Sequence, residues 1–239
     1  MLTDFTLTPL GDRAVLVRLG TTIDEATHRR VRAVCAHLGA HPVPGTIELV
    51  PAFASVAVHY DPARVPNETN GKGASPYARF AAAVGAAISD LGDEELPPPR
   101  TVEIPVCYGG AFGPDLESVA RAHELSTEDA IRLHSGGTYS VYMLGFAPGF
   151  AYLGGLPEAL VTPRRPEPRT AVPAGSVGIG GSQTGIYPLV SPGGWQLIGR
   201  TPLRMFDAER EPPTALAVGD RVRFRPIEPN EFERMAAPP

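Results

Sequence analysis

The sequence predicts an α+β protein with two parts, an N-terminal unit of alternating strands and helices and a C-terminal β-barrel. In the first part, through residue 91, apolar residues follow strand and helix periods in turn. An acidic and then proline-rich segment, residues 92–100, separates the two parts. Between Gly136 and Arg200 stand 14 glycines and 8 prolines. This density excludes long helices and favours short strands joined by tight turns, as in a small closed barrel.

The first unit opens with a strand and a helix. Residues 13–19 alternate loosely between apolar and polar side chains, which is typical of a strand. Asp24 is placed to cap a helix that extends to Ala40. The expected apolar face of this helix, near helical spacing, consists of Ala26, Val31, Val34, Cys35 and Leu38.

Two more strands and a second helix follow. Residues 46–50 and 55–60 are predicted strands, and residues 76–91 form an alanine-rich predicted helix. The order strand, helix, strand, strand, helix indicates a ferredoxin-like unit without its last strand. Residues 101–106 could supply that strand.

The domain boundary is predicted at the acidic, proline-rich segment. Its sequence, GDEELPPPR, is typical of a semi-rigid linker. We therefore assign residues 1–95 to the N-terminal α/β domain and residues 96–239 to the C-terminal barrel domain, with the linker at about residues 92–100. The strand that follows the linker could belong to either domain.

The second domain begins with helices and continues as strands. Helices are expected over residues 113–124 and 126–134, and Ser126 opens the second in the manner of a capping box. From Tyr139 onward we expect only strands and turns, the last strand being residues 221–226.

Composition excludes several classes of function. The net charge of −5 over 239 residues does not fit a nucleic-acid-binding protein, which needs a basic surface. The N-terminus lacks a signal-peptide apolar region, and no apolar run is long enough to span a bilayer, so we expect a cytoplasmic protein without membrane contact. Two cysteines are too few for a disulfide framework or a four-ligand zinc site, so no metal site is expected. The only lysine, Lys72, has no phosphate-binding motif around it.

Short matches to catalytic motifs are incomplete. His123 and Glu124 begin like a zinc-protease helix, but residue 127 is threonine rather than the second histidine. Residues 178–180 begin like a dinucleotide-binding loop, but no third glycine or helix follows, so they are expected to form a turn. Cys107 continues an alternating apolar strand and is expected to be structural. The catalytic residues are therefore left unassigned.

Arginine is concentrated in one part of the barrel domain. Residues 136–206 hold five arginines and only two acids, a local excess of positive charge in an acidic protein. Guanidinium groups recognise carboxylates and phosphates through paired hydrogen bonds, although ordinary solvated surface would show the same charge. Serine, glutamine and threonine residues on expected glycine-flanked turns adjoin them. The candidate binding residues for a small anionic ligand are Arg164, Arg169, Ser176, Gln183, Thr184 and Arg200.

Several long motifs resemble one family, the group of the 5-oxoprolinase B subunit, allophanate hydrolase subunit 1 and KipI. They are GPDLE after YGG, LGFAPGFAYLGGLP, PR followed by a second PR, VPAGSVGIGGSQTGIYP and SPGGWQLIGRTP. The resemblance is dense over residues 108–207 and weaker at the N-terminal GDRAVLVRLG. It implies an N-terminal α/β domain followed by a cyclophilin-like β-barrel.

The resemblance also implies an activity and partners. The B subunit of a 5-oxoprolinase works with a homologous C subunit and a lactam-opening A subunit, and together they hydrolyse 5-oxoproline to L-glutamate at the expense of ATP. The chain would then be inactive alone, and ATP with Mg would bind at a site shared with the partner. The candidate arginines would bind the substrate carboxylate, and Gln183 could both donate to and accept from the lactam.

The motifs leave two alternatives open. One is a KipI-like inhibitor that binds a sensor histidine kinase and has no catalytic role. The other is the allophanate or urea branch, whose members are typically fused to, or encoded beside, a biotin carboxylase. Neither that domain nor a biotinyl Met-Lys-Met is present in the sequence.

Overall fold

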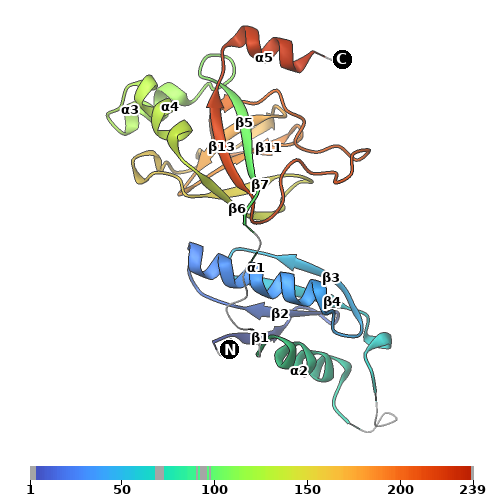
Figure 1. The fold of residues 1–239 in the computed structure, drawn as a ribbon. Helices are drawn as coiled ribbons and strands as arrows, with labels where there is room; N and C mark the ends of the chain where they lie inside the picture. Colours follow the sequence, from blue (N-terminus) through green and yellow to red (C-terminus); the bar gives the residue numbers. More distant parts are fainter. Residues whose placement is uncertain (1–3, 68–72, 90, 92–95, 97, 238–239) are drawn as a thin grey trace. The chain divides into compact units, whose positions relative to one another are not determined.

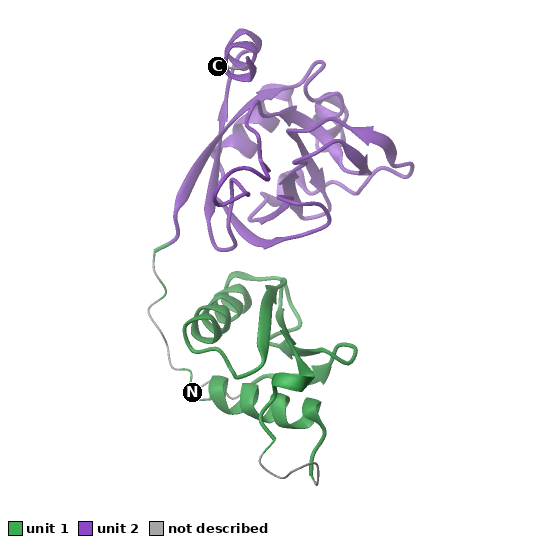
Figure 2. Ribbon diagram, turned by 90° about the vertical axis from the view of Figure 1, so that its right-hand side faces the viewer, with its two compact units in different colours: residues 1–98 green, residues 99–239 purple. Residues whose placement is uncertain are grey.

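The computed structural model describes residues 4–67, 73–89, 91, 96 and 98–237. The chain divides into two compact units, Met1–Pro98 and Pro99–Pro239 (Figure 2). The predicted boundary lay three residues earlier, in a linker of which residues 92–95 and 97 fall outside the described residues. Lys72 falls outside them as well.

The described residues of the first unit contain a four-stranded antiparallel sheet, ordered β1-β2-β4-β3 (Figure 1). Three of its strands confirm the predicted ones. The order is that of a ferredoxin-like sheet in which β1 occupies the place of the last strand. The strands are β1 (Thr6–Pro9), β2 (Ala14–Arg18), β3 (Thr46–Pro51) and β4 (Ser55–Tyr60).

Of the two places left open for residues 101–106, the structure shows the barrel and not this sheet. They belong to β5 (Thr101–Tyr108), which pairs with two strands of the second unit. The edge position beside β2 is filled by β1 from the N-terminus, with Thr6 opposite Arg18. Phe5 and Leu7 pack against the core of the first unit. The segment therefore has the alternation of a strand, but over too few residues to be recognised easily in the sequence.

Two helices pack into the same core as β2 and β4. In α1 (Glu25–Ala40), Asp24 is the N-cap and accepts a hydrogen bond of 2.7 Å from the Thr27 amide, as predicted. Ala26 is exposed rather than part of the apolar face. The second helix, α2 (Pro76–Ser89), confirms the alanine-rich prediction, and a short 3-10 turn, η1 (Pro62–Arg64), precedes it. The buried face of α1 consists of Thr27, His28, Val31, Val34 and Leu38.

The second unit is built around a closed barrel, which confirms the predicted architecture (Figure 1). Its strands, within the described residues, follow the order β10-β7-β6-β13-β5-β12-β9 and close from β9 to β10. The pair β5 and β13 is parallel, and the other barrel pairs are antiparallel. A separate two-stranded sheet joins β8 (Arg169–Val172) and β11 (Ser191–Gly193). The remaining barrel strands are β6 (Tyr139–Leu144), β7 (Ala151–Gly154), β9 (Ser176–Gly180), β10 (Gln183–Ile186), β12 (Gln196–Arg200) and β13 (Arg221–Pro226).

Helices cover parts of the barrel. The predicted pair is present as α3 (Leu116–Ala122) and α4 (Thr127–Gly136), and both contribute to the barrel core. The expectation of only strands and turns after Tyr139 is wrong, because a 3-10 turn, η2 (Glu158–Leu160), and a final helix, α5 (Pro229–Ala236), follow. Within the described chain, no helix combines the length and apolar character needed to cross a membrane.

Independent folding of the barrel unit is a prediction that follows from its strand pairing. A fragment of residues 99–239 should unfold in one cooperative thermal transition followed by circular dichroism, because it keeps β5 between β12 and β13. A fragment of residues 109–239 is the matched control, since it lacks β5 and leaves the barrel open. A molten 99–239 fragment, or equal behaviour of the two, would show that the unit depends on the rest of the chain.

Candidate functional site

An aromatic group surrounds Trp195 on one side of the barrel. Phe150, Tyr187 and Trp195 are almost fully buried and meet edge to face, with ring centroids 5.2–6.4 Å apart. Beside them lies a cavity of about 240 Å³. Its lining consists of Phe146, Phe150, Tyr152, Arg164, Pro168, Tyr187, Pro192, Gly193, Gly194 and Trp195.

Glycines in two barrel strands make room for the Trp195 ring. A Cβ atom at Gly180 would lie 2.6 Å from the ring, and one at Gly185 would lie 2.9 Å from it. The expectation that residues 178–180 form a turn is wrong, since they lie in β9, and the turn follows at Gly181 with φ of +66°. The glycine density therefore serves ring packing as well as chain reversal.

Arg164 is the cationic residue that lines this cavity. Its guanidinium carbon lies 5.8 Å from the centroid of the Trp195 ring, within the range of a cation–π contact. Among the described residues, Arg164 has no carboxylate at ion-pair distance. Phe146 stands at the rim, where the residue is 65% exposed, and its φ is +70°. The cavity thus combines aromatic walls with one exposed positive charge.

The tyrosines of the cavity remain protonated at neutral pH. Burial raises the pKa of Tyr152, and the charge of Arg164 only partly opposes this. Burial also raises the pKa of Tyr187, opposed by a hydrogen bond from the Trp195 backbone and by the charges of Arg164 and Arg169. Both phenols can therefore donate hydrogen bonds to a ligand.

A group of charges formed by Asp115, Arg165 and Arg169 lies next to the cavity. We call it the Asp115 cluster. Oδ1 of Asp115 accepts from Arg169 Nη2 at 2.8 Å and from Arg165 Nη1 at 3.2 Å. Oδ2 accepts from the backbone amide of Leu197 at 2.7 Å. The Asp115 side chain is only 7% exposed, whereas those of Arg165 and Arg169 are 37% and 24% exposed. The cluster therefore connects α3 to β8 and β12.

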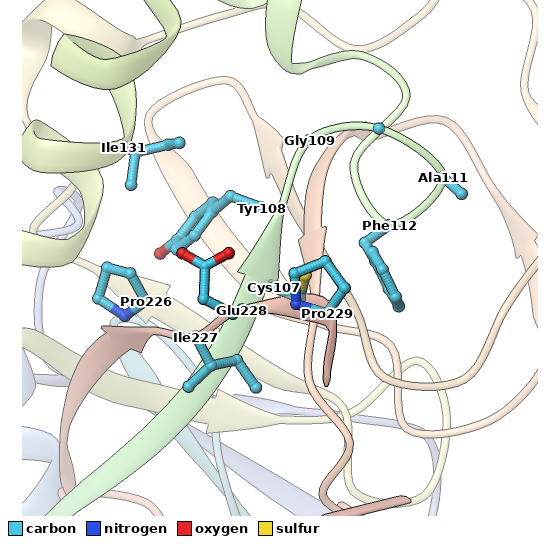
Figure 3. A pocket seen from close by; sticks show the side chains of 11 residues that line it. Cys107, Tyr108, Gly109, Ala111, Phe112, Ile131, Pro226, Ile227, Glu228 and Pro229 are labelled. Carbon is cyan, nitrogen blue, oxygen red and sulfur yellow. The ribbon is translucent and has the colours of Figure 1, made fainter. Parts of the chain in front are cut away.

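A second cavity, of about 400 Å³, lies at the end of β5 (Figure 3). It is lined by Cys107, Tyr108, Glu228 and otherwise apolar or glycine residues, among them Ile131 of α4, and none of the lining residues is cationic. Figure 3 shows Tyr108 and Phe112 on opposite sides of it. Burial, and then the charge of Glu228, raise the pKa of the Cys107 thiol, which is consistent with its predicted structural role.

A chain of hydrogen bonds runs inward from this second cavity. The Tyr108 hydroxyl is 2.8 Å from His134 Nδ1, and His134 Nε2 is 3.0 Å from the Thr184 hydroxyl. Thr184 donates to the Gly178 carbonyl, so it accepts from Nε2–H, and the Tyr108 hydroxyl then donates to Nδ1. Burial lowers the pKa of His134 to about 3, so the ring is neutral. Both ring nitrogens of His134 are used in these hydrogen bonds, and neither contacts Cys107.

The structure brings two of the predicted site residues together and separates the others. Arg164 and Arg169 lie close enough to Tyr187 for both to influence its pKa. Ser176 and Thr184 are buried in β9 and β10, not on turns, and the Thr184 hydroxyl is bonded within the barrel.

The remaining two predicted residues lie apart from the Arg164 cavity. Arg200 donates to the Ala174 carbonyl at 2.8 Å and lies 5.9 Å from the Phe232 ring of α5. Gln183 begins β10, and its Nε2 is buried without a hydrogen-bond partner among the described residues.

Sequence reasoning does not select Asp115, Arg165 or Tyr187. The sequence indicates Asp115 only as part of a helix start, and Arg165 only as one of several charges. Fifty residues separate Asp115 from Arg165, and their pairing depends on the closed barrel. The available signal was that the GPDLE and PRRPEPR segments each carry charge within a glycine- and proline-rich region.

Comparisons with known proteins identify relatives along most of the chain. The family described as carboxyltransferase domain, subdomain C and D, matches residues 5–216. The 5-oxoprolinase B subunit of Bacillus subtilis (strain 168) is 46% identical over 223 residues, which cover 93% of each chain. The 5-oxoprolinase B subunit of Escherichia coli O157:H7 is 44% identical over 217 residues, covering 91% of this chain and 94% of that protein.

A solved structure shares the fold. The crystal structure of TTHA0988 matches with a TM-score of 0.77 and 40% identity, over 90% of this chain. The present chain spans only 40% of the length of that longer protein. From the family match and the two curated relatives, the chain belongs to the carboxyltransferase domain, subdomain C and D, family, in the group of the 5-oxoprolinase B subunits.

Proposed function

We propose that this chain is the B subunit of an ATP-dependent 5-oxoprolinase, which opens 5-oxoproline to L-glutamate together with a homologous C subunit and an A subunit. The observation that carries the proposal is the identity of 46% and 44% to proteins named as 5-oxoprolinase B subunits, over more than nine-tenths of each chain. The urea amidolyase of Lachancea kluyveri matches 94% of this chain at only 25% identity and over 13% of its own length, which favours the urea branch less.

The Arg164 cavity is the proposed substrate site. At about 240 Å³ it is smaller than the roughly 300–1,000 Å³ typical of pockets for drug-sized ligands, and so it suits a small ring. The aromatic walls can enclose the pyrrolidone ring, and Arg164 can bind its carboxylate through paired hydrogen bonds. The second cavity fits less well, because Glu228 would repel that carboxylate and no lining cation would offset the repulsion.

Lactam opening requires the amide to become a better electrophile. ATP supplies this chemistry when bound, because phosphorylation of the amide oxygen creates a leaving group. This chain would bind the carboxylate through Arg164, orient the ring against Trp195 and exclude water with the aromatic walls. The lining residues carry no carboxylate, imidazole or thiol, and we propose that the reacting groups come from the other subunits.

A site shared between subunits would explain why the chain needs partners and ATP for activity. In TTHA0988 the part similar to this chain belongs to a longer polypeptide, which supports a need for further domains. We propose that the chain is inactive alone and that ATP with Mg binds at a site shared with the C subunit. On this chain, the arginines of the Asp115 cluster offer buried N–H groups that fit a phosphate.

Replacing Arg164 by lysine tests the substrate site. Lysine keeps the charge but loses the paired hydrogen bonds, so we expect the KM for 5-oxoproline to rise by about 10- to 150-fold. The measurement is ADP release by the chain reconstituted with the A and C subunits, with circular dichroism confirming the fold. Arg204→Lys is the control, since Arg204 pairs with Asp207 on the surface and lines neither cavity.

Three outcomes separate the parts of this proposal. A normal KM in Arg164→Lys would move the substrate site elsewhere. Unchanged turnover by the A and C subunits without this chain would contradict its role as their partner. Hydrolysis of 5-oxoproline by this chain alone would contradict the shared site.

A further inference from the structure

The Asp115 cluster contains two positive charges, those of Arg165 and Arg169, but only one negative charge. Two guanidinium groups converge on a single carboxylate oxygen, Oδ1 of Asp115. Within the described chain, the ion pairs recorded for Arg165 and Arg169 both end on this carboxylate. Its other oxygen is bonded to the backbone amide of Leu197. The cluster therefore has an excess positive charge of one, and both oxygens of Asp115 already accept hydrogen bonds.

Both arginines also retain hydrogen-bond donors without an acceptor. Arg165 Nε and Arg169 Nη1 are buried and have no hydrogen-bond partner among the described residues. Buried N–H groups are normally paired with protein, water or a bound ion. Arg165 contacts Asp115 through Nη1, which leaves the edge that carries Nε directed elsewhere. That edge is the one through which arginine binds carboxylate or phosphate side-on.

The cluster is rigid enough to be a binding site and open enough to be reached. The Arg165 amide donates to the Gly194 carbonyl at 2.7 Å, and Arg169 begins β8, which pairs with β11. The side chains of Arg165 and Arg169 nevertheless remain 37% and 24% exposed. A ligand at the surface can therefore contact the exposed part of each arginine without displacing Asp115, and a side-chain movement would bring it to the buried Nε and Nη1 donors.

We propose that Arg165 and Arg169, held by Asp115, form a second oxyanion site next to the Arg164 cavity, and that its ligand is a phosphate group. One arginine is enough for a planar carboxylate, whereas two guanidiniums with separate free donors suit a tetrahedral anion. A phosphate group offers three acceptor oxygens and a charge near −2 at neutral pH, which offsets the excess charge.

The position of the site relates it to the proposed reaction. Pro168 and Gly194 line the Arg164 cavity. Pro168 precedes Arg169 in the sequence, and the Gly194 carbonyl accepts a hydrogen bond from the Arg165 amide. A ring bound in the cavity and a phosphate bound to the cluster would be neighbours. The inference deepens the proposed function, since an ATP-dependent reaction needs a phosphate site. Its test uses no turnover, so the two can fail separately.

The experiment measures phosphate binding by the isolated full-length chain. Inorganic phosphate is titrated at constant ionic strength, balanced with sodium chloride, while the fluorescence of Trp195 and the thermal midpoint are followed. Trp195 is the only tryptophan in the chain, and the Leu197 amide, two residues on, is bonded to Asp115. We expect phosphate to change the fluorescence and to raise the midpoint, as a ligand of the native state does.

The variants assign the effect to the cluster. Arg165→Gln and Arg169→Gln each leave one arginine paired with Asp115, so both should fold. Each is expected to weaken phosphate binding by about 10- to 150-fold. Arg164→Gln should retain phosphate binding, which separates this site from the substrate cavity. Arg204→Gln is the surface control.

Two results would overturn the proposal. One is a phosphate effect no larger than that of sodium chloride, or one that persists in both cluster variants. The other is a response to 5-oxoproline, but not to phosphate or ATP, that is lost in Arg169→Gln. That result would assign the cluster to the substrate carboxylate instead. A response to phosphate and ATP that is lost in both cluster variants supports the proposal.

Discussion

Lowering the pH from 7 to 5 is expected to reduce the free energy of unfolding by about 2 kcal/mol through His134 alone. Burial lowers the pKa of this fully buried ring to about 3, against 6.5 for an unperturbed histidine. Below pH 6.5 the unfolded chain therefore binds a proton that the native state excludes. The stabilisation is complete above pH 6.5 and is lost as the pH falls toward 3.

The surroundings of His134 explain why the native state resists protonation. Nδ1 accepts from Tyr108 and Nε2–H donates to Thr184, so both nitrogens are engaged in the neutral form. The ring also stacks on Phe224 at a centroid distance of 4.5 Å. A second ring proton would face the Tyr108 hydroxyl, whose own proton would have to turn away in an apolar setting.

Equilibrium urea unfolding between pH 5 and pH 8, with His134→Gln as the comparison, measures this effect. Hydrogen bonds from Thr22, Ser126 and Arg204 chiefly lower the pKa of Asp24, Asp129 and Asp207, and both proteins share this acid sensitivity. The variant should be less stable at pH 7 by about 1–3 kcal/mol, because the flexible amide does not reproduce both ring hydrogen bonds in their places and the stacking on Phe224 is lost. Its stability should fall less steeply with acid. Equal slopes in the two proteins would contradict the prediction.

Local signals in the sequence predicted the elements that local chemistry determines. Asp24 and Ser126 cap helices where their side chains can reach an amide three residues on, and both hydrogen bonds are present. The glycine- and proline-rich composition of residues 136–200 predicted a barrel of short strands, because such residues exclude long helices. Helix α5 was missed because it has only eight residues, although Phe232, Met235 and Ala236 follow helical spacing.

Pairing between distant segments was not predictable in the same way. Residues 101–106 have the pattern of a strand that could pair with the sheet of either unit. Closure of the barrel places β5 between β12 and β13. Glycines that looked like turn residues lie in β9 and β10 because the Trp195 ring needs the space.

The candidate site depended on such distant pairing too. Composition indicated an arginine-rich surface, but which arginine is free and which is paired depends on where the fold places Asp115. Arg164 and Arg165 are adjacent in sequence, yet Arg164 lines the cavity and Arg165 belongs to the cluster. Neighbouring positions of one residue type thus acquire different roles from contacts about 50 residues away.

Replacing Asp115 by alanine is expected to destabilise the protein by about 3–5 kcal/mol, and the partial exposure of the arginines favours the lower end. The change leaves Arg165 and Arg169 close together without their shared counter-ion and removes the acceptor of the Leu197 amide. Asp129→Ala is the matched control, because Asp129 pairs with Arg132 on an exposed helix surface, where such a pair contributes at most about 1 kcal/mol.

A double-mutant cycle identifies the cause of that loss. If uncompensated positive charge is responsible, adding Arg169→Gln to Asp115→Ala should recover part of the stability in urea unfolding, since only one cation then remains. Phosphate should also stabilise Asp115→Ala, provided that the arginines keep their positions, because the anion takes over the neutralising role of the carboxylate. A cost for Asp115→Ala no greater than that for Asp129→Ala would mean that solvent already screens the cluster. The excess charge would then give no reason for an anion to bind there.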